Sequence, residues 1–214
     1  MPRPSSSLAE LRSLVAAWNP HPVQKAGVVP TGVAAIDEEI GGGLPGSQLT
    51  EMVAGPASGG QLVLAEILAT TRTQRQRVAL IDTVDTFAPE AILSDHLRHL
   101  VWARCHDLPE AFSVADILVR DGNYTAVVFD LRDVPVVSLN RFPKTHWHRL
   151  HRVAERQPAA VLVLSRFGLV PAVQYRIELS PVLTLAGKSQ PRPEILAALR
   201  VALVRGTQGA ERTG

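Results

Sequence analysis

The sequence predicts an α/β domain in which helices flank a mainly parallel β-sheet on both faces. Short, continuous apolar runs recur along the chain and alternate with segments of helical pattern, as expected for strands buried on both faces. Glycine- and proline-rich turns separate these segments. With 214 residues, 46% of them apolar, the chain is long enough to build one sizeable core.

The strands are predicted from the apolar runs. We expect buried strands over residues 48–54, 78–83, 100–104, 126–131 and 160–165. The pattern is less regular toward the end of the chain. There we expect one or two strands at the sheet edge, in an antiparallel arrangement as one option, from residues 175–185 and 199–205.

The helices are predicted from the segments between the strands. We expect them over residues 33–40, 61–72, 90–97, 109–120 and 145–156. A glycine-rich turn over residues 41–46 precedes the first strand. The sequence Asp121-Gly122-Asn123 ends the fourth helix, because glycine readily adopts the left-handed conformation that closes a helix.

The first residues predict a separate amphipathic helix over residues 8–18. Ser7 can cap it and Glu10 follows three residues later, as in a capping box. The apolar stripe, spaced three to four residues apart, consists of Leu8, Leu11, Leu14, Val15 and Trp18. The prolines at 20 and 22 then favour an extended linker. We expect this helix to serve self-association or docking; the alternative is a helix folded back on its own domain.

These patterns divide the chain into three parts. We expect a helix and linker over residues 1–27, a core domain over residues 28–205, and a disordered tail over residues 206–214. No apolar run approaches the length of a membrane span, and the first residues lack the pattern of a signal peptide. Cys105 is the single cysteine, which excludes an intrachain disulfide. We expect a soluble cytoplasmic protein with no membrane partner.

The charges are unevenly distributed. Residues 132–205 carry 12 basic against 4 acidic side chains, a net charge of +8, whereas the whole chain has a net charge of +2. Most of the basic residues are arginines, whose planar fork suits phosphate and carboxylate groups. A basic half favours nucleic acid or an acidic protein partner. The alternative is an ordinary solvated surface.

A glycine-rich segment carries the functional argument. It follows a predicted strand and opens a predicted helix, as a phosphate-binding loop does, and it reads Gly55, Pro56, Ala57, Ser58, Gly59, Gly60, Gln61, Leu62. The spacing fits the phosphate-binding motif, but Gln61 and Leu62 replace the lysine that contacts phosphate and the hydroxyl residue that binds magnesium. The backbone amides can still hold an anion. We therefore expect neither ATP nor magnesium as a cofactor, and no metal site.

The surrounding motifs resemble the ATPase core of RecA recombinases. The resemblance rests on the T-G-x-x-x-x-D segment over residues 31–37, on residues 41–46, which are similar to the family's G-G-L-P-x-G turn, and on residues 55–60, which are similar to its G-P-x-x-S-G loop, in that order. It implies a RecA-like P-loop NTPase fold with a degenerate Walker A loop. It also implies that Asp130 is the Walker B-like aspartate. Val84 stands where the family has its catalytic glutamate, with Asp85 one residue along. Three catalytic features are thus altered, which predicts a protein that is not an enzyme.

A narrower resemblance is to ImuA, the RecA-like accessory family of bacterial damage-induced mutagenesis. It rests on the segments 120–123, 128–132, 143–150 and 162–165, at similar spacing. The resemblance implies a role in SOS-induced translesion DNA synthesis beside an inactive Y-family polymerase homologue, ImuB, and an error-prone replicative-type polymerase, with RecA and DNA as further partners. Two alternatives stay open: an atypical RecA-like ATPase in DNA repair, and a cell-division inhibitor of the damage response.

The remaining candidates are a basic helix face and a group of acids. Arg149, Arg152 and Arg156 lie three or four residues apart, which predicts one exposed basic stripe for DNA or a partner. The histidine pairs 96/99 and 148/151 lack further ligands for a metal. Four aspartates are expected to meet at the carboxyl edge of the sheet, for structural hydrogen bonding in preference to magnesium binding, namely Asp82, Asp85, Asp130 and Asp133.

Overall fold

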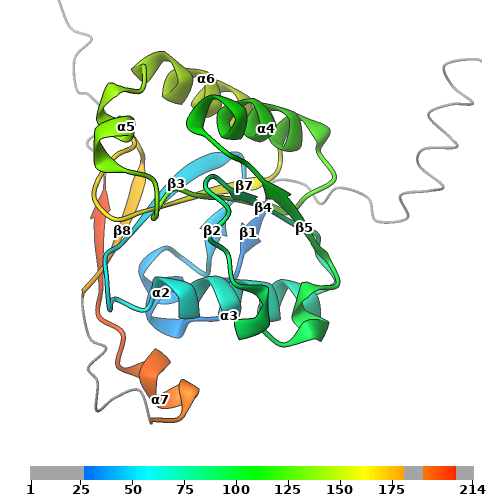
Figure 1. The fold of residues 1–214 in the computed structure, drawn as a ribbon. Helices are drawn as coiled ribbons and strands as arrows, with labels where there is room; N and C mark the ends of the chain where they lie inside the picture. Colours follow the sequence, from blue (N-terminus) through cyan, green and yellow to red (C-terminus); the bar gives the residue numbers. More distant parts are fainter. Residues whose placement is uncertain (1–26, 181–189, 206–214) are drawn as a thin grey trace, which may run out of the picture.

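The computed structural model describes residues 27–180 and 190–205, and it confirms the α/β class. Figure 1 shows a central sheet with helices on both faces. The seven strands lie in the order β5-β4-β6-β7-β3-β8-β9. Their bounds are Gln48–Ala54 (β3), Val78–Asp82 (β4), Leu100–Arg104 (β5), Ala126–Asp130 (β6), Ala160–Ser165 (β7), Tyr175–Leu179 (β8) and Val201–Arg205 (β9). All neighbouring strands are parallel except β8 and β9, which are antiparallel. An antiparallel pair at the sheet edge was one of the two arrangements expected for the end of the chain.

The sheet separates two hydrophobic cores. Helices α2 (Ala34–Glu39) and α3 (Gly60–Thr73) lie on one face, and α4 (Leu108–Asp121), α5 (Val136–Arg141) and α6 (Lys144–Ala154) on the other (Figure 1). Successive residues of a strand point to opposite faces, so Val128 belongs to the core under α3 and Phe129 to the core under α4 and α6. This explains why the central strands read as continuous apolar runs.

A short two-stranded ribbon and a carboxylate hold the entry to the domain. The strands β1 (Val28–Val29) and β2 (Leu44–Pro45) pair antiparallel. Asp37 of α2 accepts hydrogen bonds from the backbone nitrogen and hydroxyl of Thr31, both at 2.8 Å, and from the nitrogen of Gly32. Gly32 has a φ of +80°, and a Cβ there would lie 2.1 Å from the hydroxyl of Thr70. The T-G-x-x-x-x-D motif therefore has a structural role: its aspartate fixes the turn that precedes α2.

The helix predicted over residues 90–97 is wrong. The chain instead forms two 3₁₀ turns, η1 (Pro89–Ala91) and η2 (Ser94–Leu97), separated by two extended residues. Ile92 is buried in the core, whereas Leu93 is 68% exposed. A residue that leaves the helical conformation to bury its side chain interrupts the helix at that point.

Two short helices were not predicted. They are α5 and α7 (Arg192–Ala197), and each begins directly after a proline, at 135 and 191. Each has only six residues, which is too short for a 3.6-residue period to be read from sequence. The predicted helix over residues 8–18 and the predicted tail over residues 206–214 lie outside the described residues. Within the described part of the chain, no helix is both long and apolar enough to cross a membrane.

Candidate functional site

The glycine-rich segment lies between β3 and α3, as predicted, and forms a compact loop. Ser58 is fully buried, and its backbone nitrogen and hydroxyl both donate to the carbonyl oxygen of Gly55, the hydroxyl at 2.7 Å. Ala57 and Gly59 have left-handed φ values of +59° and +88°. The loop thus keeps a defined shape through its own hydrogen bonds.

Two glycines of the loop are required by packing. A Cβ at Gly60 would lie 2.6 Å from the Cβ of Ala54 at the end of β3. A Cβ at Gly59 would lie 2.6 Å from a methyl group of Leu199, which comes from the chain just before β9. The C-terminal segment therefore packs directly against the loop. Close contact with protein explains these glycines without reference to a bound phosphate.

Arg132 occupies the centre of the candidate site. Its Nε donates to one carboxylate oxygen of Asp130 at 2.9 Å and its terminal nitrogen to the other at 2.5 Å. The same terminal nitrogen donates to Oε1 of Gln61 at 3.1 Å. The side chains of Arg132 and Asp130 are only 14% and 9% exposed. An internal arginine therefore joins the Walker B-like aspartate to the first helical turn after the loop.

The electrostatics of this pair favour the charged form of Arg132. Burial opposes the charge on Arg132, but the hydrogen bonds and the attraction of Asp130 outweigh it, so the pKa of Arg132 is raised above its ordinary value. Two charges taken out of water need close partners and complete hydrogen bonding, and this fork geometry supplies them. Both carboxylate oxygens of Asp130 accept hydrogen bonds from the guanidinium group of Arg132.

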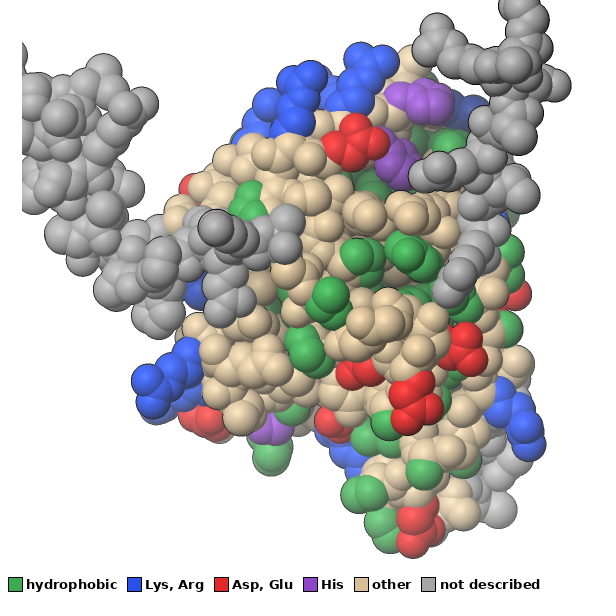
Figure 2. Space-filling view, turned by 180° about the vertical axis from the view of Figure 1, so that it is seen from behind, with side chains coloured by type: hydrophobic (Ala, Val, Ile, Leu, Met, Phe, Trp, Pro, Cys, Tyr) green, Lys and Arg blue, Asp and Glu red, His purple; other side chains and the backbone are tan. Residues whose placement is uncertain are grey.

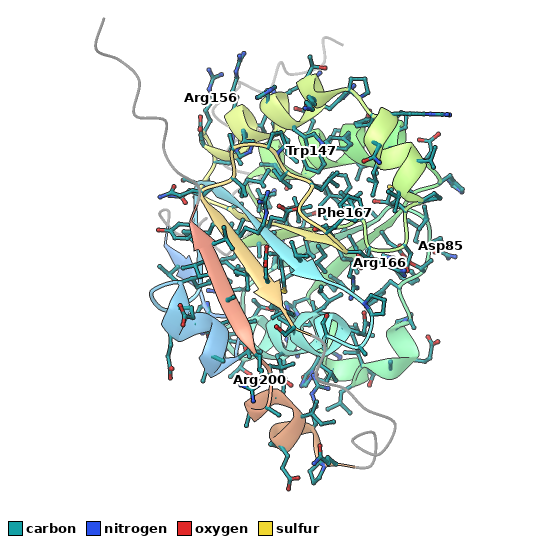
Figure 3. All side chains as sticks on the ribbon, turned by 90° about the vertical axis from the view of Figure 1, so that its left-hand side faces the viewer. Asp85, Trp147, Arg156, Arg166, Phe167 and Arg200 are labelled. Atoms are coloured by element: carbon teal, nitrogen blue, oxygen red, sulfur yellow. The ribbon has the colours of Figure 1, made fainter. Side chains whose placement is uncertain are left out.

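A cleft of about 330 Å³ opens beside the loop. The loop residues and Arg132 form one wall, while Thr86, Asp133 and Arg166 come from the ends of neighbouring strands. Arg166 pairs with Asp133, which also accepts the hydroxyl of Thr86 at 3.1 Å. Figure 3 shows Arg166 and Asp85 at the same edge of the molecule. The cleft thus lies at the carboxyl edge of the sheet, where α/β proteins bind ligands.

The four aspartates do gather at this edge, and each is bonded to a donor. Asp82 and Asp130 are register partners on β4 and β6. Asp82 accepts from the backbone nitrogens of Thr86 and Phe87 at 3.0 and 2.9 Å, and from Nε1 of Trp102. Asp85 forms a bidentate pair with Arg104 at 2.6 Å. Each carboxylate therefore has a structural role.

Metal ligands do not gather in the described ranges, which contain no group of three His, Cys, Asp or Glu side chains able to hold an ion. The histidines have other partners: His99 contacts the hydroxyl of Thr71, and His151 contacts the carbonyl oxygen of Pro171. Val84, which the resemblance to RecA recombinases implies at the position of a catalytic glutamate, packs against the core under α4 and α6. A valine offers no group that can accept a proton.

The basic stripe has the exposure that the sequence predicts, although α6 ends at Ala154 and Arg156 lies in the turn directly after it. Arg149, Arg152 and Arg156 are exposed, while Trp147 and Leu150 of the same helix are buried. Figure 2 shows basic side chains gathered along the top of the molecule, the side over which α6 runs in Figure 1, and Figure 3 shows Arg156 projecting outward there. Arg149 differs from the other two arginines because it bonds Asp116 of α4, at 2.9 and 3.2 Å.

Sequence reasoning missed a further buried acid. Glu51 of β3 is fully buried, and it accepts hydrogen bonds from the Ser165 hydroxyl, the backbone nitrogens of Leu169 and Val170, and Nε of Arg176. These donors come from β7, the following loop and β8. A lone acid inside an apolar run was the only available signal, and its partners lie more than 100 residues away in sequence.

Comparison with known proteins gives one consistent relationship. No family model matches the chain. The chain is similar to RecA of Bifidobacterium breve, with 32% identity over 113 residues, 51% of this chain and 29% of the relative. It is likewise similar to RecA of Rubrobacter xylanophilus, 36% identical over 112 residues, and of Methylococcus capsulatus, 31% identical over 112 residues, in each case 50% of this chain and 32% of the relative.

The matched segment covers about half of this chain and under a third of each relative. The similarity supports a RecA-like relationship, and the sheet flanked by helices fits a RecA-like fold.

Proposed function

We propose that this chain is a non-catalytic, RecA-like accessory protein in SOS-induced translesion synthesis, acting through protein partners and DNA. The similarity to RecA supports the link to DNA damage. The resemblance to ImuA supports the narrower role, with ImuB, an error-prone replicative-type polymerase and RecA as partners. ATP and magnesium are not cofactors in this proposal.

The observation that carries the non-catalytic part is the bonding of Arg132. Its guanidinium spans both oxygens of Asp130 and the side-chain oxygen of Gln61. A magnesium ion near Asp130 would compete with a buried cation for the same oxygens. Gln61 lacks the charge of the usual lysine, and Leu62 lacks the oxygen that magnesium prefers. Each of these differences weakens nucleotide binding for a separate reason.

The side chains that surround the loop instead give it a structural role. Arg132 donates to the side-chain oxygen of Gln61 in the first turn of α3, and Asp130 neutralises its charge, so side chains of the protein itself join this turn to the end of β6. Leu199 and Ala54 pack against the loop glycines from two sides. A rigid domain of this kind suits a protein that presents surfaces to partners.

The basic face on α6 is the proposed surface for DNA or an acidic partner. Arg152 and Arg156 are exposed, and the C-terminal half is strongly basic. Phosphate contacts of this kind position a protein on nucleic acid without reading its sequence. The proposal therefore expects binding without strong sequence preference.

Reciprocal co-purification tests the proposed role. The full chain is tested with the ImuB-type polymerase homologue, the error-prone polymerase, RecA and, as the alternative, the cell-division GTPase. We expect capture of the polymerase homologue, with weaker capture by an Arg152→Glu/Arg156→Glu variant than by the matched surface variant Arg98→Glu. Capture of the division GTPase alone would support the division-inhibitor alternative.

A further inference from the structure

A groove on the face opposite α3 is left open by the described residues. It lies between α4 and α6, has a volume of about 290 Å³, and is lined by apolar groups of Phe112, Ile117 and Leu150 together with Asp116 and Arg149. Ile117 is 65% exposed although it stands on the wall of this groove. Figure 1 shows the two helices side by side above the sheet.

We propose that this groove is the docking site for the chain's own N-terminal segment, residues 8–18. An amphipathic helix laid into an apolar groove is a common recognition mode, with anchors three and four residues apart. The sequence of this segment provides such anchors, namely Leu8, Leu11, Leu14, Val15 and Trp18. The inference stands on the groove and the tether, and it does not depend on the proposed function.

The tether begins beside the C-terminal end of α6, past the groove residues of that helix. The backbone nitrogen of Gly46 donates to the carbonyl oxygen of Gly27 at 2.7 Å, and the hydroxyl of Ser47 donates to the carbonyl oxygen of Gln157 at 2.8 Å. Gln157 follows the C-terminal end of α6 by three residues. The described chain therefore starts next to the end of one of the two helices that form the groove.

The linker is long enough to reach the groove. The residues between Trp18 and Gly27 can span up to about 30 Å when extended. Helix α6 has 11 residues, so its length is about 16 Å. A short tether of this kind gives the segment an effective concentration on the order of millimolar at its own domain, which favours docking within one chain over docking on a second copy.

The other segments outside the described residues fit the groove poorly. Residues 206–214 contain no large apolar side chain. Residues 181–189 are held at both ends, between β8 and α7, and α7 lies on the opposite side of the sheet from α4 and α6 (Figure 1). The 8–18 segment alone combines an apolar stripe with a tether at the groove.

Apolar contact, and not charge, would hold this occupant in the groove. The segment carries one acid, Glu10, and one base, Arg12, so its net charge is zero. Docking would cover Ile117 and the apolar stripe together, and release would expose both to a partner.

Hydrogen–deuterium exchange of the full chain and of a chain lacking residues 1–22 tests the proposal. We expect the truncated domain to stay folded, with faster exchange confined to α4 and α6. The Ile117→Asp variant of the full chain should lose the same protection, whereas Val137→Asp, at a 59% exposed position of α5, should keep it. Unchanged exchange at α4 and α6 after truncation, or unfolding of the truncated domain, overturns the proposal.

Cysteine cross-linking separates the same chain from a second copy. A Leu14→Cys/Ile117→Cys chain should form an intrachain disulfide. The rate should not depend on protein concentration, because both cysteines belong to one chain. Cys105 is buried and does not compete for the cross-link. A covalent dimer that forms faster at higher concentration, or no cross-link at all, contradicts docking in the same chain.

Discussion

Arg132 donates to both carboxylate oxygens of Asp130, the residue two positions before it, and the same guanidinium reaches Gln61. The three residues come from the end of β6 and the start of α3. The guanidinium group of Arg132 thereby joins the end of β6 to the first turn of α3. This relationship underlies both the stability and the proposed inactivity of the site.

Removing Arg132 should destabilise the domain. The Arg132→Met variant leaves the carboxylate of Asp130, which is 9% exposed, without its cation. Breaking a buried pair on one side costs about 3–5 kcal/mol in the free energy of unfolding. Urea unfolding followed by circular dichroism measures this loss. The Asp130→Asn/Arg132→Met double variant should recover part of it, and an unchanged midpoint in the single variant would show that the pair contributes nothing.

Glu51 should matter far more than an acid on the neighbouring strand. It is fully buried with four donors, so the Glu51→Ala variant leaves Arg176 and two backbone nitrogens without an acceptor. We expect a loss of about 3–5 kcal/mol. The matched control is Glu178→Ala, an exposed position of β8, which should change stability by less than about 0.5 kcal/mol. Equal effects of the two variants in urea unfolding would refute the structural role of Glu51.

Stability should fall as the pH drops through the range of histidine titration. Burial lowers the pKa of His99 below its ordinary value of 6.5, and the charges of Arg72 and His96 lower it further against the opposing effect of Asp95. Burial likewise lowers the pKa of His151. At a pH between the two pKa values, the unfolded chain therefore binds more protons than the folded chain. The free energy of unfolding is highest above the ordinary histidine pKa of the unfolded chain. It decreases as the pH falls through the lower pKa of the folded chain.

Urea midpoints at about pH 7.5 and about pH 5.5 measure this dependence. We expect the lower midpoint at the lower pH, and a smaller difference in a His99→Gln variant. A midpoint that does not change, or rises, between these two values would contradict the expected sign.

Binding to single- or double-stranded DNA should depend on the exposed face of α6 and on salt. Counterion release makes the affinity fall steeply with salt concentration, and each lost phosphate contact reduces the slope by about one. Arg152→Glu and Arg156→Glu should each weaken binding more than Arg98→Glu, which lies away from α6 on the chain between η2 and β5. Fluorescence anisotropy across a salt series provides the measurement. Equal affinity at low and physiological salt would remove DNA from the proposed partners.

Local patterns predicted much of the fold because they report burial directly. The strands at 48–54, 100–104 and 160–165 have the predicted bounds. The strand at 160–165 is buried along its whole length and reads as a plain apolar run, whereas the edge strand at 100–104 is partly exposed. Helix α4 ends at Gly122, whose φ of +71° suits the left-handed closing position. The 90–97 segment failed because burial of Ile92 decided its conformation, and an isolated sequence does not show which side of that segment faces the core.

The site was predicted in part for the same reason. The loop was predicted from its spacing and its place between a strand and a helix, whereas the roles of Asp130 and Val84 were implied by the resemblance to RecA recombinases. Arg132 was passed over because its role depends on the direction of its side chain toward Gln61, 71 residues earlier. Leu199 against Gly59, and Glu51 with Arg176, are long-range contacts of the same kind. Sequence spacing predicts elements, whereas these contacts depend on how the elements pack.

The most direct test of the account is titration of the purified full chain with ATP, with and without magnesium, together with a turnover assay. The account predicts no saturable magnesium-dependent binding and no hydrolysis above background, because Gln61, Leu62 and Val84 lack the needed groups and Arg132 holds Asp130. Restoring the loop with Gln61→Lys/Leu62→Thr should not by itself recover turnover. Saturable magnesium-dependent binding, with hydrolysis that disappears in an Asp130→Asn variant, would contradict the central claim.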